Sequence, residues 1–144
     1  MASSEAPKDF APHNTFGYAL KRAQHAMRQN MDRQLKDLGL SAPQYAVLAS
    51  VEVEPGASNA HLARLAFVTP QTMQVMLVKL EQTGLIERVP DQDHGRIQKT
   101  LLTDRGRKTL RLAHAAAEKS EQIAKKVASK GAAEMLQQVA DALG

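Results

Sequence analysis

The sequence predicts a mainly α-helical fold with one small β-hairpin. Over several segments apolar residues recur every three or four positions, the period of a helix with one face against a core. Two short β-prone runs stand close together in the second half of the chain, with turn residues between them. The 144 residues, 43% of them hydrophobic, are enough to bury one core. We therefore expect a single compact domain.

The first helix is predicted over residues 15–38. Apolar side chains from Phe16 to Leu38 follow the helical period, and Gly39 is suited to end the helix in a left-handed conformation. Residues 1–14 lack this pattern and are expected to form a flexible tail.

A second helix is predicted from residue 42 to about Val53. Ser41 and Gln44 have the spacing of a capping box, in which each side chain accepts a hydrogen bond from the other residue's backbone N–H. Pro43 fits inside the first turn, where its missing N–H has no consequence.

A short helix and a longer one follow, joined by a tight turn. Ser58 is the predicted cap of the short helix, which ends near Ala66, and Thr69 before Pro70 caps the longer one. Gly84 is placed to end it. The apolar stripe predicted to face the core is Met73, Met76, Leu77 and Leu80, and the residues on another face are Gln71, Gln74, Val75 and Val78.

The predicted hairpin comes next, and two helices complete the chain. Its strands are Ile86–Val89 and Ile97–Leu102, and the turn PDQDHGR between them places Arg96 near the tip. Helix, tight turn, helix and basic hairpin in this order predict a winged helix-turn-helix, a fold that reads DNA. Of the last two helices, the first is predicted to be capped by Thr103 and to run to about Lys130. After a break at Gly131, the second follows the stripe Met135, Leu136, Val139 and Leu143.

Composition narrows the class of protein. The 19 Lys and Arg against 15 Asp and Glu give a net charge of +4, which is compatible with a polyanionic partner. The start of the chain has no signal-peptide pattern and no apolar run reaches about 18 residues, so we expect a cytoplasmic protein without membrane contact. The absence of cysteine excludes disulfides, thiolate metal sites and thiol redox sensing.

Enzymatic motifs are missing from the sequence. The five histidines belong to no zinc-protease, hydrolase or phosphate-loop pattern. Asp91, Asp93 and His94 could group on the hairpin, but without a further ligand a solvated loop is the better interpretation. His25 and His114 are read as packing or surface residues. We expect no enzyme, no metal site and no cofactor.

The start of the longer helix carries the residue types that read DNA. Small or polar side chains there can reach base edges in a major groove, whereas the alternative is an ordinary solvated helix face. Arg96 is predicted to enter the minor groove, the alternative being a solvated turn arginine. Plausible phosphate contacts are Arg64, Lys79, Arg88, Lys99 and Arg105. The predicted DNA-binding set is Thr69, Pro70, Gln71, Thr72, Gln74, Val75, Val78, Lys79, Arg64 and Arg96.

Three of these residues suggest a base preference. The amides of Gln71 and Gln74 can each bond adenine N6 and N7 together, and Val75 can pack on a thymine methyl. The sequence thus predicts half-sites that contain A·T pairs.

The motifs LSAPQYAVLASV, SNAHLARLAFVTPQTMQVMLVKLEQTGLIERV and DQDHGRIQKTLLTDRG, in this order and spacing, resemble the MarR (multiple antibiotic resistance regulator) family. The resemblance covers about residues 15–143. It implies a homodimer, with residues 15–40 and 104–144 as a helical dimerisation region and residues 41–103 as the DNA-binding lobe. His94 stands where the family usually has an Asp that supports the wing, and Val75 and Val78 occupy positions that are often polar.

The resemblance also implies a function. It is that of a transcriptional regulator, usually a repressor, which binds a pseudo-palindromic double-stranded DNA operator and is released by a small aromatic or phenolic ligand. The alternative is a winged-helix module that binds a protein, or binds DNA without operator specificity. The residues expected to line the ligand cavity, unless they belong to the core, are Phe16, Tyr18, His25, Met27, Arg28, Tyr45 and Leu48.

Overall fold

The computed structural model describes residues 11–144. Of the expected tail, residues 1–14, the first ten residues therefore lie outside the described part of the chain. Pro12–Asn14 form a short 3-10 turn, η1, and the Thr15 hydroxyl then caps the first helix by accepting a hydrogen bond from the backbone N–H of Tyr18.

The first helix ends earlier than its apolar pattern predicts. Helix α1 spans Phe16–Leu35, and Lys36–Leu38 form a separate 3-10 turn, η2. Gly39 adopts a left-handed backbone, φ 69°, and its N–H bonds the carbonyl of Lys36, which tightens the last turn. Side-chain periodicity cannot separate such a turn from the helix before it.

The helices of the lobe begin at the predicted caps. Ser41, Ser58 and Thr69 each accept a hydrogen bond from the backbone N–H three residues later, and the capping box between Ser41 and Gln44 is formed on both sides. Gly84, with φ 75°, follows the last of these helices, the one capped by Thr69, as predicted. The bounds are α2 Ala42–Val53, α3 Asn59–Leu65 and α4 Pro70–Gln82.

The hairpin pairs strand β1, Ile86–Pro90, with strand β2, Gln98–Leu102, in antiparallel register. Ile86 lies opposite Leu102. The second strand starts one residue later than predicted, because both backbone groups of Ile97 bond within the turn: its N–H donates to His94 and its carbonyl accepts from Asp91.

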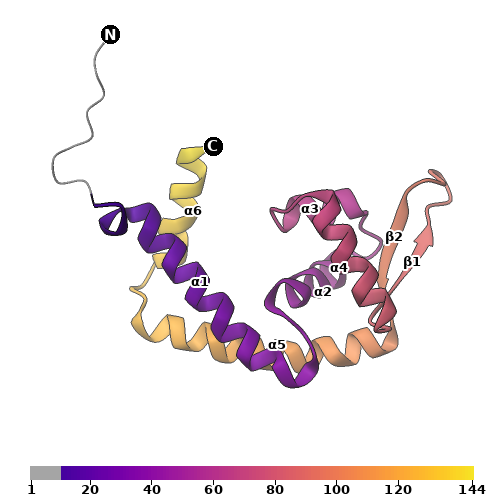
Figure 1. Ribbon diagram of the computed structural model, residues 1–144, viewed down its shortest axis with the longest axis horizontal. Coiled ribbons are helices and arrows are strands. Elements are labelled where there is room, and N and C mark those ends of the chain that lie inside the picture. Colours follow the sequence, from indigo (N-terminus) through magenta and orange to yellow (C-terminus); the bar gives the residue numbers. More distant parts are fainter. Residues whose placement is uncertain (1–10) are drawn as a thin grey trace, which may run out of the picture.

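Two helices follow the hairpin. Helix α5, Asp104–Val127, is capped by Thr103 and runs along the base of the molecule in Figure 1, where it packs against α1 and α2. It ends three residues before the predicted Lys130, because Ala128 takes an extended backbone. Gly131, with φ 83°, then begins α6, Ala132–Leu143, at the far end of α5.

The core lies where α5 meets the lobe. Leu48, Leu62, Leu77 and Leu110, from four different helices, are 0–1% exposed. The first turn of α5 also approaches the turn after α4 very closely, since a Cβ added at Gly106 would lie 1.9 Å from a backbone oxygen. This contact holds the start of α5 against the lobe.

The outer helices bury much less. No residue of α6, which the structure describes throughout, is buried. Large apolar side chains also stand exposed on α1 and on the second half of α5. Among the described helices, none is both long and apolar enough to cross a membrane. The most exposed side chains of this group are Phe16 (54%), Ile123 (51%), Val127 (87%), Met135 (47%) and Leu143 (83%).

Candidate nucleic-acid interface

The first turns of α4 present a polar face to solvent. Gln71, Thr72 and Gln74 are exposed, Val75 is 71% exposed and Val78 is half-buried. On the opposite side Met73, Leu77 and Leu80 are buried and Met76 is half-buried, so the predicted division of the helix into two faces is confirmed.

Contacts within the chain hold the start of α4 in place. The Thr69 hydroxyl accepts from the backbone N–H of Thr72 at 3.1 Å, and Asn59 of α3 donates from Nδ2 to the Pro70 carbonyl at 3.2 Å. Phe67 in the turn between α3 and α4 has φ 54° and is 96% exposed. The sequence did not predict the left-handed backbone of Phe67, because no glycine marks this turn. It did not predict the contact of Asn59 either, because that contact joins two helices.

The tip of the hairpin is organised by Asp91. Its Oδ1 accepts from the backbone N–H of Asp93 at 2.9 Å, and its own N–H donates to the Ile97 carbonyl at 2.8 Å. The N–H of Asp93 is the main reason that the pKa of the Asp91 carboxyl lies below its usual value. A carboxylate therefore supports this turn although His94 stands at the position where the resemblance implied one.

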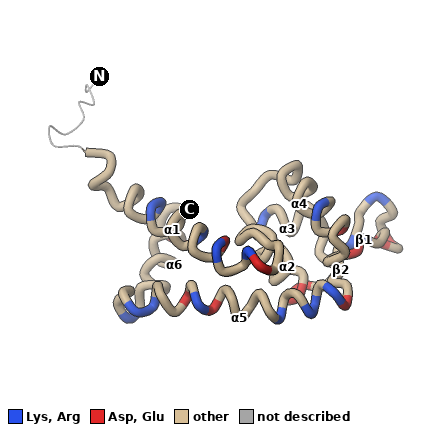
Figure 2. The backbone as a smooth tube through the Cα atoms, turned by 60° about the horizontal axis from the view of Figure 1, so that its bottom comes forward, with Lys and Arg blue, Asp and Glu red and all other residues tan. Residues whose placement is uncertain are grey.

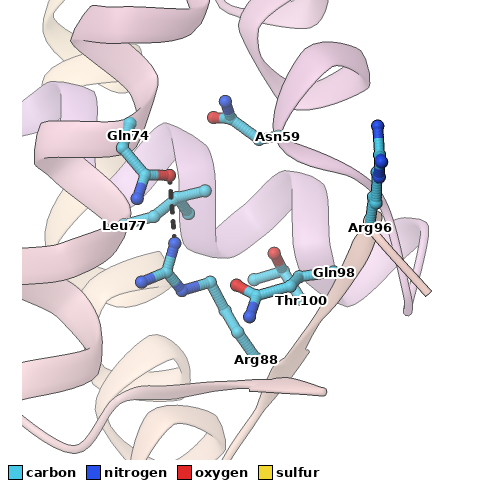
Figure 3. A pocket seen from close by; sticks show the side chains of 7 residues that line it. All are labelled: Asn59, Gln74, Leu77, Arg88, Arg96, Gln98 and Thr100. Atoms are coloured by element: carbon cyan, nitrogen blue, oxygen red, sulfur yellow. Dashed lines mark hydrogen bonds between the residues drawn. The ribbon is translucent and has the colours of Figure 1, made fainter. Parts of the chain in front are cut away.

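A cleft of about 210 Å³ separates α4 from the hairpin (Figure 3). Arg88 of β1 lies across it and donates to both carboxylate oxygens of Glu81, at 3.3 and 3.2 Å, and to Gln74 Oε1 at 3.0 Å. The Arg96 side chain points away from this pair. The residues that line the cleft are Asn59, Gln74, Leu77, Arg88, Arg96, Gln98 and Thr100.

Arg88 differs in this respect from the other cations considered as phosphate contacts. Its side chain is only 12% exposed and is paired with Glu81, whose carboxyl pKa is lowered chiefly by the hydrogen bond from Arg88. Of those cations, Arg64, Lys79 and Arg105 are exposed and Lys99 is half-buried. Arg96, predicted for the minor groove, is exposed, and Figure 2 shows cations on α3, on α4 and on the hairpin. Glu81 has no sequence pattern that links it to Arg88, because the pair joins a helix to a strand.

The ligand candidates separate into groups. Met27 and Arg28 line a groove of about 370 Å³ between α1 and the lobe, together with residues of α2 and α4. Phe16, Tyr18 and His25 are exposed on α1 and do not line it. Leu48, fully buried, and Tyr45 do not line it either.

Tyr45 instead connects α2 to α5. Its hydroxyl lies 2.9 Å from His114 Nδ1, and the other ring nitrogen of His114 lies 2.9 Å from Glu52. Burial, followed by the negative charge of Glu52, raises the pKa of Tyr45.

Asp91, Asp93 and His94 form no metal site, and no cluster of three potential ligands exists within residues 11–144.

Comparison with known proteins identifies the family. Residues 38–97 match the model of the MarR family. The HTH-type transcriptional repressor Rv2887 of Mycobacterium tuberculosis is 39% identical over 99 residues, which are 69% of this chain and 71% of that protein.

Solved structures agree with the sequence match. Rv2887 in complex with salicylic acid is similar with a TM-score of 0.67 and 32% identity, over 94% of this chain and 98% of that one. The transcriptional repressor CouR, bound to a 23-mer DNA duplex, has a TM-score of 0.82 at 24% identity over 97% and 100% of the two chains, a likeness of fold. This protein, with its winged helix-turn-helix, therefore belongs to the MarR family of DNA-binding transcriptional regulators.

Proposed function

We propose that the protein is a homodimeric, sequence-specific repressor whose hold on its operator is weakened by a small aromatic ligand. The observation that carries this proposal is the exposed polar face at the start of α4 beside the exposed Arg96 of the wing. A helix with such a face fits a major groove, and an exposed arginine near the tip of the hairpin fits the adjacent minor groove. Rv2887, the relative at 39% identity, is itself a transcriptional repressor.

The DNA-binding set consists of the residues predicted on α4, with Arg64 and Arg96 as flanking contacts. Thr69 and Pro70 place the first N–H groups of α4 toward a phosphate, and Gln71, Thr72 and Gln74 face the base edges. Lys79 and Arg64 supply exposed charge for the backbone on either side. The duplex bound to CouR supports this assignment, since a protein of the same fold holds DNA.

Residues 15–40 and 104–144 form the dimerisation region in this proposal, and residues 41–103 form the DNA-binding lobe. The exposed apolar side chains of α1, α5 and α6 support the assignment, because a second chain can cover them. Two lobes related by a twofold axis would contact half-sites about one helical turn apart, which requires a pseudo-palindromic operator.

The groove lined by Met27 and Arg28 is the proposed effector site. Its apolar wall suits an aromatic ring, and the Arg28 guanidinium suits a carboxylate at the rim. Rv2887 was solved with salicylic acid and with p-aminosalicylic acid, both aromatic carboxylates. The groove touches α1, α2 and α4 together, so a ligand there can change how the lobe sits on the dimerisation region.

Selection of bound fragments from fragmented genomic DNA of the source organism tests this function. We expect the recovered fragments to share a pseudo-palindromic sequence, and salicylate to reduce their retention by wild-type protein more than by Arg28→Ala. Fragments without any shared sequence would favour the second candidate, an architectural or protein-binding winged-helix module.

A further inference from the structure

A chain of hydrogen bonds joins the wing to the exposed polar face of α4. Arg88 sits on β1, Glu81 in the last turn of α4, and Gln74 two turns earlier on the exposed face of the same helix. Glu81 receives three bonds from Arg88: one from its backbone N–H at 3.2 Å and two from its guanidinium. The remaining terminal nitrogen donates to Gln74 Oε1 at 3.0 Å, as Figure 3 shows.

This arrangement holds the guanidinium firmly. Two parallel bonds to one carboxylate define the plane of an arginine side chain, and the charge on both partners strengthens them. The Arg88 side chain is only 12% exposed, whereas the Glu81 side chain is 41% exposed, so the guanidinium is shielded from water better than its carboxylate partner. The nitrogen that points at Gln74 therefore has a defined position before any DNA is bound.

The chemistry of the two side chains determines how the amide is oriented. A guanidinium can only donate hydrogen bonds, whereas a glutamine amide has one oxygen that accepts and one nitrogen that donates. Gln74 must therefore turn its oxygen toward Arg88. That oxygen has two lone pairs, one of which Arg88 occupies, so the group that remains wholly free for a base is the NH₂, which only donates.

Base edges in the major groove differ in what they offer to such a donor. Guanine presents two acceptors, N7 and O6, and thymine presents the acceptor O4. Adenine presents an acceptor, N7, beside a donor, N6–H₂, and a glutamine satisfies both only if its oxygen is available. An oxygen bonded to Arg88 disfavours that pairing.

We propose that Arg88 is a specificity-determining positioning residue, which holds Gln74 as a hydrogen-bond donor so that the base opposite it is guanine or thymine rather than adenine. The inference rests on the proposed function, since it needs α4 in a major groove. It replaces the adenine preference that Gln74 suggested in the sequence. Arg88 itself touches no base in this account and acts through Gln74.

Base preference measured at fixed salt tests the inference. Duplexes with a randomised core are first selected with wild-type protein, and single-base variants of the selected sequence are then titrated. Gln74→Ala identifies the position in each half-site that depends on Gln74. At that position we expect wild type to prefer guanine or thymine, and Arg88→Met to improve the relative affinity for adenine about tenfold, the discrimination typical of one base contact.

A double variant separates positioning from a general structural role. In the Gln74→Ala background, Arg88→Met should leave the base profile unchanged, because the group through which Arg88 acts is missing. Lys99→Met is the charge-matched control on the neighbouring strand. It removes the same charge without contacting Gln74, and should weaken all sequences alike.

Glu81→Gln keeps the test decisive if Arg88→Met does not fold. It loosens the guanidinium while leaving Gln74 in place, so we expect a smaller shift toward adenine. Wild-type preference for adenine at the Gln74-dependent position, or unchanged profiles in all foldable variants of Arg88 and Glu81, would overturn the inference and leave the proposed function standing. Failure of wild type to enrich any sequence would overturn both.

Discussion

The DNA-binding lobe and the outer helices differ in how much of their apolar side chains they bury. In the lobe, Leu48, Leu62 and Leu77 are 0–1% exposed and pack within one chain. In α6, which is more strongly amphipathic than α2 and α4, Met135 and Leu136 remain 47% and 40% exposed. An apolar stripe therefore predicts that a surface will be covered, but only the fold determines whether the same chain covers it.

Helix α5 contains both situations. As far as Ser120 it buries Leu110, Ala113 and Ala117 against the lobe and α1. Ser120 donates a hydrogen bond to Asn30 Oδ1 at 2.7 Å. After Ser120 no residue of this fully described helix is buried, and Ile123 is 51% exposed. The boundary between the part of α5 that buries side chains within this chain and the part that leaves them exposed therefore lies just after Ser120.

The largest expected effect comes from deleting residues 132–144, which are α6 and Gly144. The lobe should stay folded, because no residue of α6 contributes to its core, whereas the dimer should dissociate or aggregate. Loss of the second lobe should reduce operator affinity about a hundredfold or more. Light scattering and operator titration measure both effects, with Gln138→Ala as a control on the exposed face. A deletion variant that remains dimeric and binds normally would refute the proposed dimerisation region.

Gly106→Ala should produce the largest loss of stability at the contact between α5 and the lobe. A Cβ there would lie 1.9 Å from the Leu85 carbonyl oxygen, so the backbone of α5 or of the turn must shift. We expect the free energy of unfolding to fall by about 3 kcal/mol in denaturant titration. Gly95→Ala is the matched control, because no atom lies within 4 Å of its added Cβ. Equal stability of the two variants would contradict the packing described here.

Arg96→Ala should weaken operator binding and its dependence on salt. If each wing places one guanidinium in a groove of high negative potential, the log-log salt slope should flatten by up to about two units per dimer. Arg111→Ala, on the exposed face of α5, should leave the slope nearly unchanged. An Arg96→Ala slope equal to that of wild type would place the Arg96 side chain in solvent.

The smallest effect concerns Tyr45 at alkaline pH. Its pKa is raised by burial and by Glu52, so the folded state retains the phenol proton where the unfolded chain loses it. The stabilisation is therefore complete below the ordinary tyrosine pKa of about 10 and declines as pH rises through the higher folded value. Ultraviolet titration should show a late-ionising component that Tyr45→Phe removes. A wild-type titration identical to that of Tyr45→Phe after scaling for one phenol would rule it out.

Local signals were the ones that the sequence predicted well. The caps at Ser41, Ser58, Thr69 and Thr103 depend on residues three positions apart, and the structure confirms each of them. Helix ends were predicted less well where the backbone changes without a change in side-chain period, as at Leu35.

Contacts between elements were beyond the sequence. The bonds of Arg88 to Gln74 and Glu81 join a strand to two turns of a helix, and that of Tyr45 to His114 spans 69 residues. Helical period placed Tyr18, Met27 and Arg28 on one helix, but only packing separates the two that line the groove from the one that does not. Side-chain chemistry thus predicted which residues can act, and tertiary structure decides which ones meet.

The specificity ratio at physiological salt tests the central claim most directly. Wild-type affinity is measured for the recovered operator and for a duplex of the same length and composition in scrambled order. A repressor that reads bases through α4 should prefer the operator by at least about a thousandfold. Equal affinity for the two duplexes would contradict the account and identify the winged helix as a module without operator specificity.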